Sequence, residues 1–106
     1  MSEETDTIQL GGNIHLSGFS SLDGGSMIIL KKILGNYAKK FSERCKDFED
    51  LKVYMKVVHE REKSEKYEIK GQLNVGGKPH VADETDYNLF FVVDIVMKRL
   101  EGMIES

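Results

Sequence analysis

Lysine is the residue type whose spacing in this sequence most clearly suggests a chemical role. Two pairs, Lys31-Lys32 and Lys39-Lys40, fall in one helical segment, and single lysines recur at alternate positions further along. Their ammonium groups could contact nucleic-acid phosphates, because each neutralised phosphate releases a condensed counterion. The alternative is an ordinary solvated surface that keeps the protein soluble. The candidate RNA contacts are Lys31, Lys32, Lys39, Lys40, Lys52, Tyr54, Lys56, Lys70, Lys78 and Arg99.

Tyr54 is an aromatic side chain flanked by these lysines, with Lys52 and Lys56 two residues away on either side. An aromatic ring on an open sheet surface can stack on an unpaired base. The competing interpretation is that Tyr54 packs against a residue of the neighbouring strand. The sequence leaves both interpretations open.

Catalytic or metal chemistry has little support in the sequence. His15, His59 and His80 fall on different predicted elements without the spacing of metal ligands, so no metal site is expected. Cys45 is the single cysteine, so no intramolecular disulfide is expected and the side chain is interpreted as structural. No His, Cys, Ser and acidic residues occur at the spacing of a recognisable catalytic arrangement. We therefore predict that the protein is not an enzyme and uses no cofactor, metal or small-molecule substrate.

Charge is unevenly distributed along the chain, although the net charge is only −3. Residues 27–80 carry thirteen Lys and Arg against eight Asp and Glu. Residues 1–26 carry four acidic and no basic residues, and residues 81–106 carry six acidic and two basic residues. A basic middle between acidic ends is compatible with a local contact to a polyanion.

The length of 106 residues predicts a single domain over residues 1–106, with residues 1–6 as a disordered acidic tail. No apolar run is long enough to cross a bilayer, and the acidic N-terminus lacks the features of a signal peptide. Together with the lone cysteine, this composition favours a reducing, cytoplasmic location and no membrane partner.

The first part of the chain predicts a strand and then a helix. Thr7–Leu16 is expected to be one strand, interrupted by a bulge at Gly11-Gly12. Apolar residues then recur with helical period from Met27 to about Arg44. Asp23 or Ser26 can cap this helix by accepting hydrogen bonds from its first backbone N–H groups.

The remainder predicts three antiparallel strands followed by a second helix. Leu51–Val58 alternates between apolar and polar residues, and Tyr67–Val75 with Lys78–Ala82 forms a hairpin closed by Gly76-Gly77. Leu89–Ile104 has the apolar content of a long helix that covers this hairpin. The predicted fold class is α+β, with the order β-α-β-β-β-α and an antiparallel-rich four-stranded sheet. Both helices are expected on one face, as in a double-stranded-RNA-binding domain, with the other face open.

Phe91 and Ile95 fall outside the apolar arc of the Leu89–Ile104 helix that faces the core. Large apolar residues one turn apart on an otherwise polar face suggest a second contact surface. They could pack sideways on the first helix, or they could form the interface of a homodimer or other protein partner.

The closing part of the chain carries a family resemblance. Leu73–Ala82, followed by Asn88–Asp94 and by Lys98–Glu101, resembles the ribosome hibernation-promoting factors, also called the ribosome-associated inhibitor family. Members typically show an alternating strand, a Gly-rich turn, and a helix with an Asp-aliphatic-aromatic-Ala-Ala-Ile-Asp pattern followed by Lys-Leu-Glu. Here Phe91 and Val92 stand where the family has two alanines.

The resemblance implies the function of a single-domain, short-form member. Such a protein has no catalytic activity. It contacts the rRNA of the small ribosomal subunit through Lys and Arg, and blocks translation under stress by occupying the mRNA and tRNA channel. The alternatives are an RNA-binding module for another RNA, and a homodimeric interaction domain that uses Phe91 and Ile95.

Overall fold

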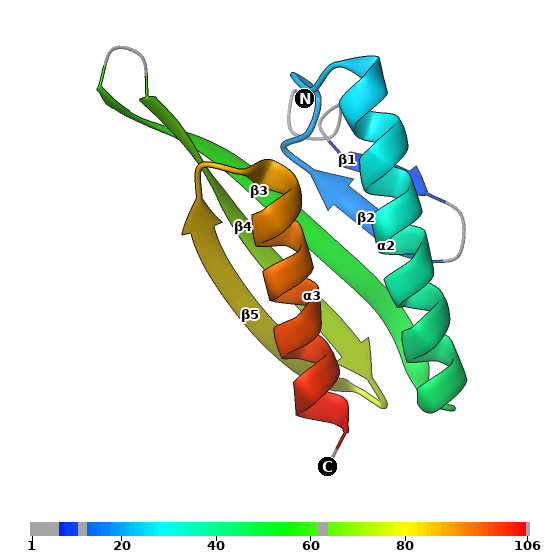
Figure 1. Cartoon of the computed structure of the whole chain (residues 1–106). Coiled ribbons are helices and arrows are strands. Elements are labelled where there is room, and N and C mark those ends of the chain that lie inside the picture. The colour runs from blue at the N-terminus through cyan, green and yellow to red at the C-terminus, as the bar shows by residue number, and fades with distance from the viewer. Residues whose placement is uncertain (1–6, 11–12, 62–63, 106) are drawn as a thin grey trace.

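The computed structural model describes residues 7–10, 13–61 and 64–105, so the predicted tail over residues 1–6 lies outside the described residues. The elements within these ranges are β1 (Thr7–Leu10), β2 (Ile14–Ser17), α2 (Gly24–Arg44), β3 (Phe48–Arg61), β4 (Ser64–Val75), β5 (Lys78–Asp86) and α3 (Leu89–Ile104). Both helices cover one face of a single sheet, and the other face is open (Figure 1). From β2 onward the order is β-α-β-β-β-α, which confirms the predicted fold class.

The strands of the sheet lie in their sequence order, β1-β2-β3-β4-β5. β2 and β3 pair in parallel, and the other neighbouring strands pair antiparallel. The parallel pair requires a crossover, which α2 supplies. Strands β3, β4 and β5 form the predicted antiparallel meander, while β1 makes the described sheet one strand wider than expected.

The prediction of one strand over Thr7–Leu16 is wrong. This segment forms the antiparallel pair β1 and β2, with Leu10 opposite Ile14. Asn13, just before β2, has φ 67°, a backbone conformation in which Asn is enriched among residues other than Gly. Gly11 and Gly12, where a bulge is predicted, lie outside the described residues.

One hydrophobic core fills the space between the helices and the sheet. α2 lies over β2 and β3, and α3 lies over β4 and β5 (Figure 1). Alternate positions in the central parts of β3 and β4 point toward the helices and are buried, as period-two patterning predicts. The completely buried residues of this core include Leu16, Leu30, Leu34, Phe41, Leu51, Val53, Ile69, Leu73, Val92, Val93, Val96, Met97 and Leu100.

Local signals explain where the helices and the last hairpin begin and end. The Asp23 carboxylate accepts a 3.0 Å hydrogen bond from the backbone N–H of Ser26, so Asp23 is the cap of α2. Asn88 caps α3 in the same way, through a 3.1 Å bond from the N–H of Phe91. Gly76 and Gly77 have φ of 57° and 80°, which confirms the predicted turn between β4 and β5.

The long strands extend further than their apolar alternation suggests. β3 runs over Phe48–Arg61, beyond the predicted Leu51–Val58, and pairs with β4 along most of its length. Apart from Phe48, its added residues are polar or charged, and backbone pairing with β4 does not need apolar side chains.

Candidate nucleic-acid interface

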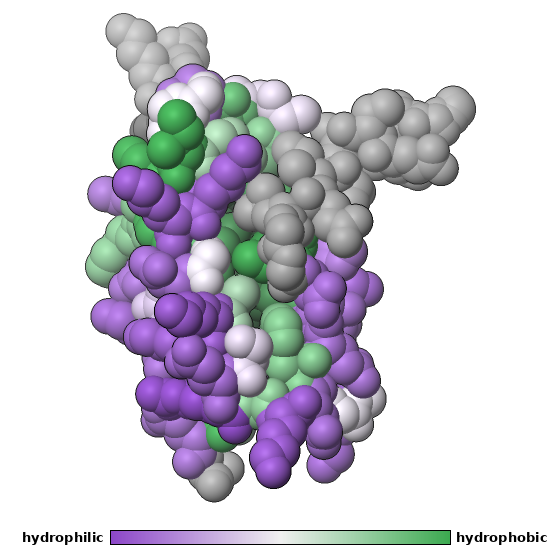
Figure 2. Space-filling model, turned by 90° about the vertical axis from the view of Figure 1, so that its right-hand side faces the viewer, coloured by the Kyte–Doolittle hydropathy of each residue, from purple (hydrophilic) through white to green (hydrophobic). Residues whose placement is uncertain are grey.

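The predicted RNA contacts lie on two opposite sides of the molecule. Lys31, Lys32, Lys39 and Lys40 belong to α2, in the helix layer. Lys52, Tyr54, Lys56 and Lys70 occupy the strand positions that alternate with buried core residues, and therefore face away from the helices. Seen from the side of α2, hydrophilic surface lies on either side of a more hydrophobic strip (Figure 2). The fold thus divides these residues into two groups separated by the thickness of the sheet.

The α2 group is the more strongly basic of the two. Lys31, Lys32, Lys39 and Lys40 are all exposed, and none of them forms an ion pair with another described residue. Over its whole length α2 carries five basic side chains and a single acidic one, Glu43. Arg44 is paired with Glu101 and Glu105, so the positive charge that α2 offers to a polyanion comes from the four lysines.

The open-sheet group is centred on Tyr54, which is 38% exposed. Its cross-strand neighbour is Lys70, and Lys52 and Lys56 flank it along β3. Acidic residues alternate with these lysines, because Glu68 lies opposite Lys56 and Asp83 lies opposite Lys70. This face can offer a ring and ammonium groups to an unpaired base, but its charge is mixed.

Lys78 and Arg99 lie apart from both groups. Lys78 is exposed at the start of β5, beside the Gly76-Gly77 turn. The Arg99 guanidinium forms a 2.7 Å ion pair with Glu84 and donates a 2.7 Å hydrogen bond to the backbone carbonyl of Asp83. Arg99 therefore ties α3 to β5, and its charge is balanced within the fold.

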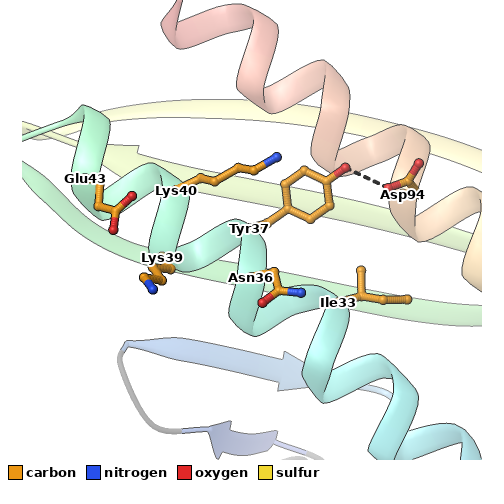
Figure 3. A pocket seen from close by; sticks show the side chains of 7 residues that line it. All are labelled: Ile33, Asn36, Tyr37, Lys39, Lys40, Glu43 and Asp94. Carbon is orange, nitrogen blue, oxygen red and sulfur yellow. Dashed lines mark hydrogen bonds between the residues drawn. The ribbon is translucent and has the colours of Figure 1, made fainter.

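Tyr37 and Asp94 form a contact that the sequence does not reveal. Tyr37 of α2 is only 8% exposed, and its hydroxyl donates a 2.6 Å hydrogen bond to Asp94 of α3 (Figure 3). This bond is the main reason that the pKa of Asp94 lies below its usual value, and Lys98, at 3.2 Å, adds to the effect. Burial, followed by the nearby carboxylate, raises the pKa of Tyr37. An Asp inside an apolar helix was a possible signal, but its partner lies 57 residues away.

Phe91 and Ile95 differ in how far the fold covers them. Phe91 is 54% exposed, so a sideways contact with α2 does not bury it, and Ile95 is half-buried. Ile28 and Ile29, in the first turns of α2, are 60% and 47% exposed. The helix layer therefore presents large apolar side chains near the start of both helices.

Within the described ranges, His, Cys, Asp and Glu side chains do not gather in threes as metal ligands would. Cys45 is half-buried and unpaired with another cysteine. In the described part of the chain, neither α2 nor α3 is long and apolar enough to span a membrane.

No protein-family model matches the chain, and no curated protein matches it. The α+β fold with its β-α-β-β-β-α order is therefore established by the structure, whereas the resemblance of Leu73–Glu101 to hibernation factors stays a prediction.

Proposed function

We propose that the protein binds rRNA of the small ribosomal subunit through α2 and inhibits translation by occupying that site. The observation that carries the proposal is the set of four exposed α2 lysines without an ion-pair partner among the described residues. The sequence resemblance over Leu73–Glu101 supplies the identity of the RNA.

The physical basis of binding is electrostatic and geometric. Lys32 and Lys39 lie about two turns apart on one helix, a spacing of roughly 10 Å. Several such cations along a helix can neutralise successive phosphates and release their counterions. Occupancy needs no nucleophile or cofactor, because inhibition follows from excluding another ligand from the same place.

The direct test is cosedimentation with small ribosomal subunits. Changing Lys31, Lys32, Lys39 and Lys40 to Glu is expected to abolish binding. The thermal melt should change little, because these side chains are exposed and form no described ion pair, and only Lys40 contacts a neighbouring ring. The measurement is the fraction of protein that migrates with the subunit at low and at high salt.

A matched control comes from the opposite face. Lys52, Lys56 and Lys70 changed to Glu should weaken binding much less, because Glu68 and Asp83 already offset part of their charge. Binding that survives in the α2 variant would show that α2 is not the contact. Binding to free RNA hairpins that equals binding to the subunit would favour a module for another RNA.

A second candidate function is a homodimeric interaction domain. It is favoured by Phe91, which stays 54% exposed at a position where the resembled family has a small residue. This candidate predicts a salt-resistant dimer that does not bind ribosomal subunits.

A further inference from the structure

A cleft of about 560 Å³ opens between α2 and α3 on the outer side of the helix layer. Its walls include Asn36, Lys39, Lys40 and Glu43 from α2, and Asp94 from α3 (Figure 3). Two adjacent lysines and an amide give this cleft hydrogen-bond donors that suit an anion.

Lys40 differs from the other α2 lysines because the fold holds its ammonium group in place. The Nζ atom of Lys40 lies 5.1 Å from the centre of the Tyr37 ring, a cation–π distance. The ring is in turn fixed by its hydroxyl bond to Asp94 and by a neighbouring Phe41 ring at 6.1 Å. Lys39, the adjacent residue, extends in another direction and has no described ring or ion-pair contact (Figure 3).

A positioned ammonium group loses less side-chain entropy on binding than a free one. A lysine side chain loses most of its rotamer freedom when it is immobilised. The contact with the Tyr37 ring already restricts the Lys40 side chain before an anion binds. Lys40 should therefore bind an anion more strongly than Lys39 does.

The carboxylates of the cleft act differently on an incoming anion. Asp94 accepts the Tyr37 hydroxyl bond and lies 3.2 Å from Lys98, and Lys40 also attracts it, so its charge is largely compensated. Glu43 lines the cleft without a described ion pair, so it opposes an anion. Lys40 forms no described ion pair and can contact an anion, whereas Glu43 weakens the binding of an anion in the cleft.

We propose that the α2–α3 cleft is a phosphate subsite in which Lys40 makes the main contact, while Tyr37 and Asp94 are positioning residues. The proposal rests on the proposed function, since the phosphate would come from the RNA backbone. In this proposal the four α2 lysines contribute unequally to RNA affinity. The difference arises because the Tyr37–Asp94 pair between the two helices positions Lys40.

The test compares single substitutions by the affinity for a labelled RNA hairpin and for small ribosomal subunits, each across a range of salt. Lys40→Met should weaken binding about tenfold, as expected for a hydrogen bond between charged groups. It should also lower the slope of log K against log salt by about 0.9. Lys39→Met, the matched control, should weaken binding by no more than about twofold, since its ammonium group is not preorganised. Equal effects of the two changes would overturn the subsite.

The positioning role has its own readout. Tyr37→Leu removes the ring, so it should weaken binding while the salt slope stays that of the wild type, because Lys40 still reaches the phosphate. In a Lys40→Met background, Tyr37→Leu should have no further effect on affinity. A further loss there would mean that Tyr37 does not act through Lys40, which contradicts the positioning role. A thermal melt of each variant shows whether such a loss follows from lower stability of the fold.

Glu43→Gln should tighten binding, because it removes the uncompensated carboxylate from the cleft. Unchanged or weaker binding would contradict the assignment of the anion to this cleft. Titration with inorganic pyrophosphate, followed by NMR shifts of Tyr37, separates the two phosphate sources. Shifts in the wild type that are lost in Lys40→Met would indicate a free phosphate ligand, and hairpin-dependent shifts alone would indicate the RNA backbone.

Failure of the ribosomal proposal has a different signature. The wild-type protein could fail to bind the subunit and still bind the hairpin, with Lys40 contributing far more than Lys39. This result would support the subsite and exclude the ribosome as the partner. If the wild-type protein binds the subunit and the two lysines contribute equally, the ribosomal function is supported and the subsite is excluded. Wild type that binds neither RNA nor pyrophosphate would remove both.

Discussion

Gly71 is a position where the absence of a side chain lets a helix approach the sheet. It lies between Ile69 and Leu73 on the helix-facing side of β4. A Cβ atom there would lie 2.9 Å from Cγ1 of Val96 and 3.1 Å from Cδ1 of Leu100. The gap that Gly71 leaves in the apolar alternation of this strand is therefore filled by α3.

Gly71→Ala is expected to destabilise the protein by about 1–3 kcal/mol, because β-branched Val96 cannot easily move aside. Urea denaturation would show this as a lower midpoint at an unchanged slope. The control is Gly102→Ala in α3, where a Cβ would meet nothing within 4 Å. That change should raise stability by up to about 1 kcal/mol through helix propensity. Equal midpoints for Gly71→Ala and wild type would contradict the close approach.

The two helices run in the same direction and are linked at two levels. Tyr37 bonds to Asp94 near the middle of the helices. About two turns further on, Arg44 lies 3.4 Å from Glu101, and it also pairs with Glu105. The Arg44 pairs are exposed, and such pairs contribute little to stability. The Tyr37–Asp94 bond is better shielded, since Tyr37 is buried, and it should be the more important of the two links.

Tyr37→Phe should lower stability by about 1 kcal/mol near pH 7 and should reduce the loss of stability in acid. The bond depresses the pKa of Asp94 in the folded state below the ordinary 3.8. Its contribution is therefore present above that value and is lost as pH falls through the lowered pKa. Urea denaturation at about pH 7 and about pH 3 measures both effects. Tyr54→Phe, on the exposed sheet face, is the control and should follow the wild type; an unchanged acid response in Tyr37→Phe would contradict the assignment.

The whole molecule is a two-layer plate with different surfaces on its two sides, measuring 45 × 29 × 24 Å. The helix layer combines the basic side chains of α2 with exposed apolar residues, namely Ile28, Ile29 and Phe91. Contact with another molecule through this layer would cover the α2 lysines as well. Pairing of two copies through their helix layers would thus compete with the proposed binding of RNA.

Phe91→Asp separates these two uses of the helix layer. If two copies pair through Phe91, wild type should sediment as a dimer that persists at high salt, because burial of an apolar side chain depends little on salt. The substitution should then give a monomer. The free energy of unfolding of that monomer should lie within about 0.5 kcal/mol of the value for the wild-type monomer, because Phe91 is exposed. Sedimentation velocity makes the comparison, with Lys98→Ala on the same helix as control. A monomeric wild type would exclude the interaction domain.

Short-range sequence patterns correctly predict most of the helices and strands. The α3 bounds, the Gly76-Gly77 turn and the buried faces of β3 and β4 agree with the prediction, because each depends on residues only a few positions apart. The prediction for Thr7–Leu16 is wrong because one strand with a bulge and two short paired strands share the same apolar pattern.

The list of basic residues was readable from the chain, but their grouping was not. Whether Lys40 and Lys52 share a surface depends on which side of the sheet each element lies, and the folded chain puts them on opposite sides. Likewise, Arg99 pairs with Glu84 and Tyr37 meets Asp94 only through packing between elements distant in sequence. The periodicity of a sequence depends only on residues that are close along the chain. The compensation of a charge depends on residues that are close in space, and only the fold determines those.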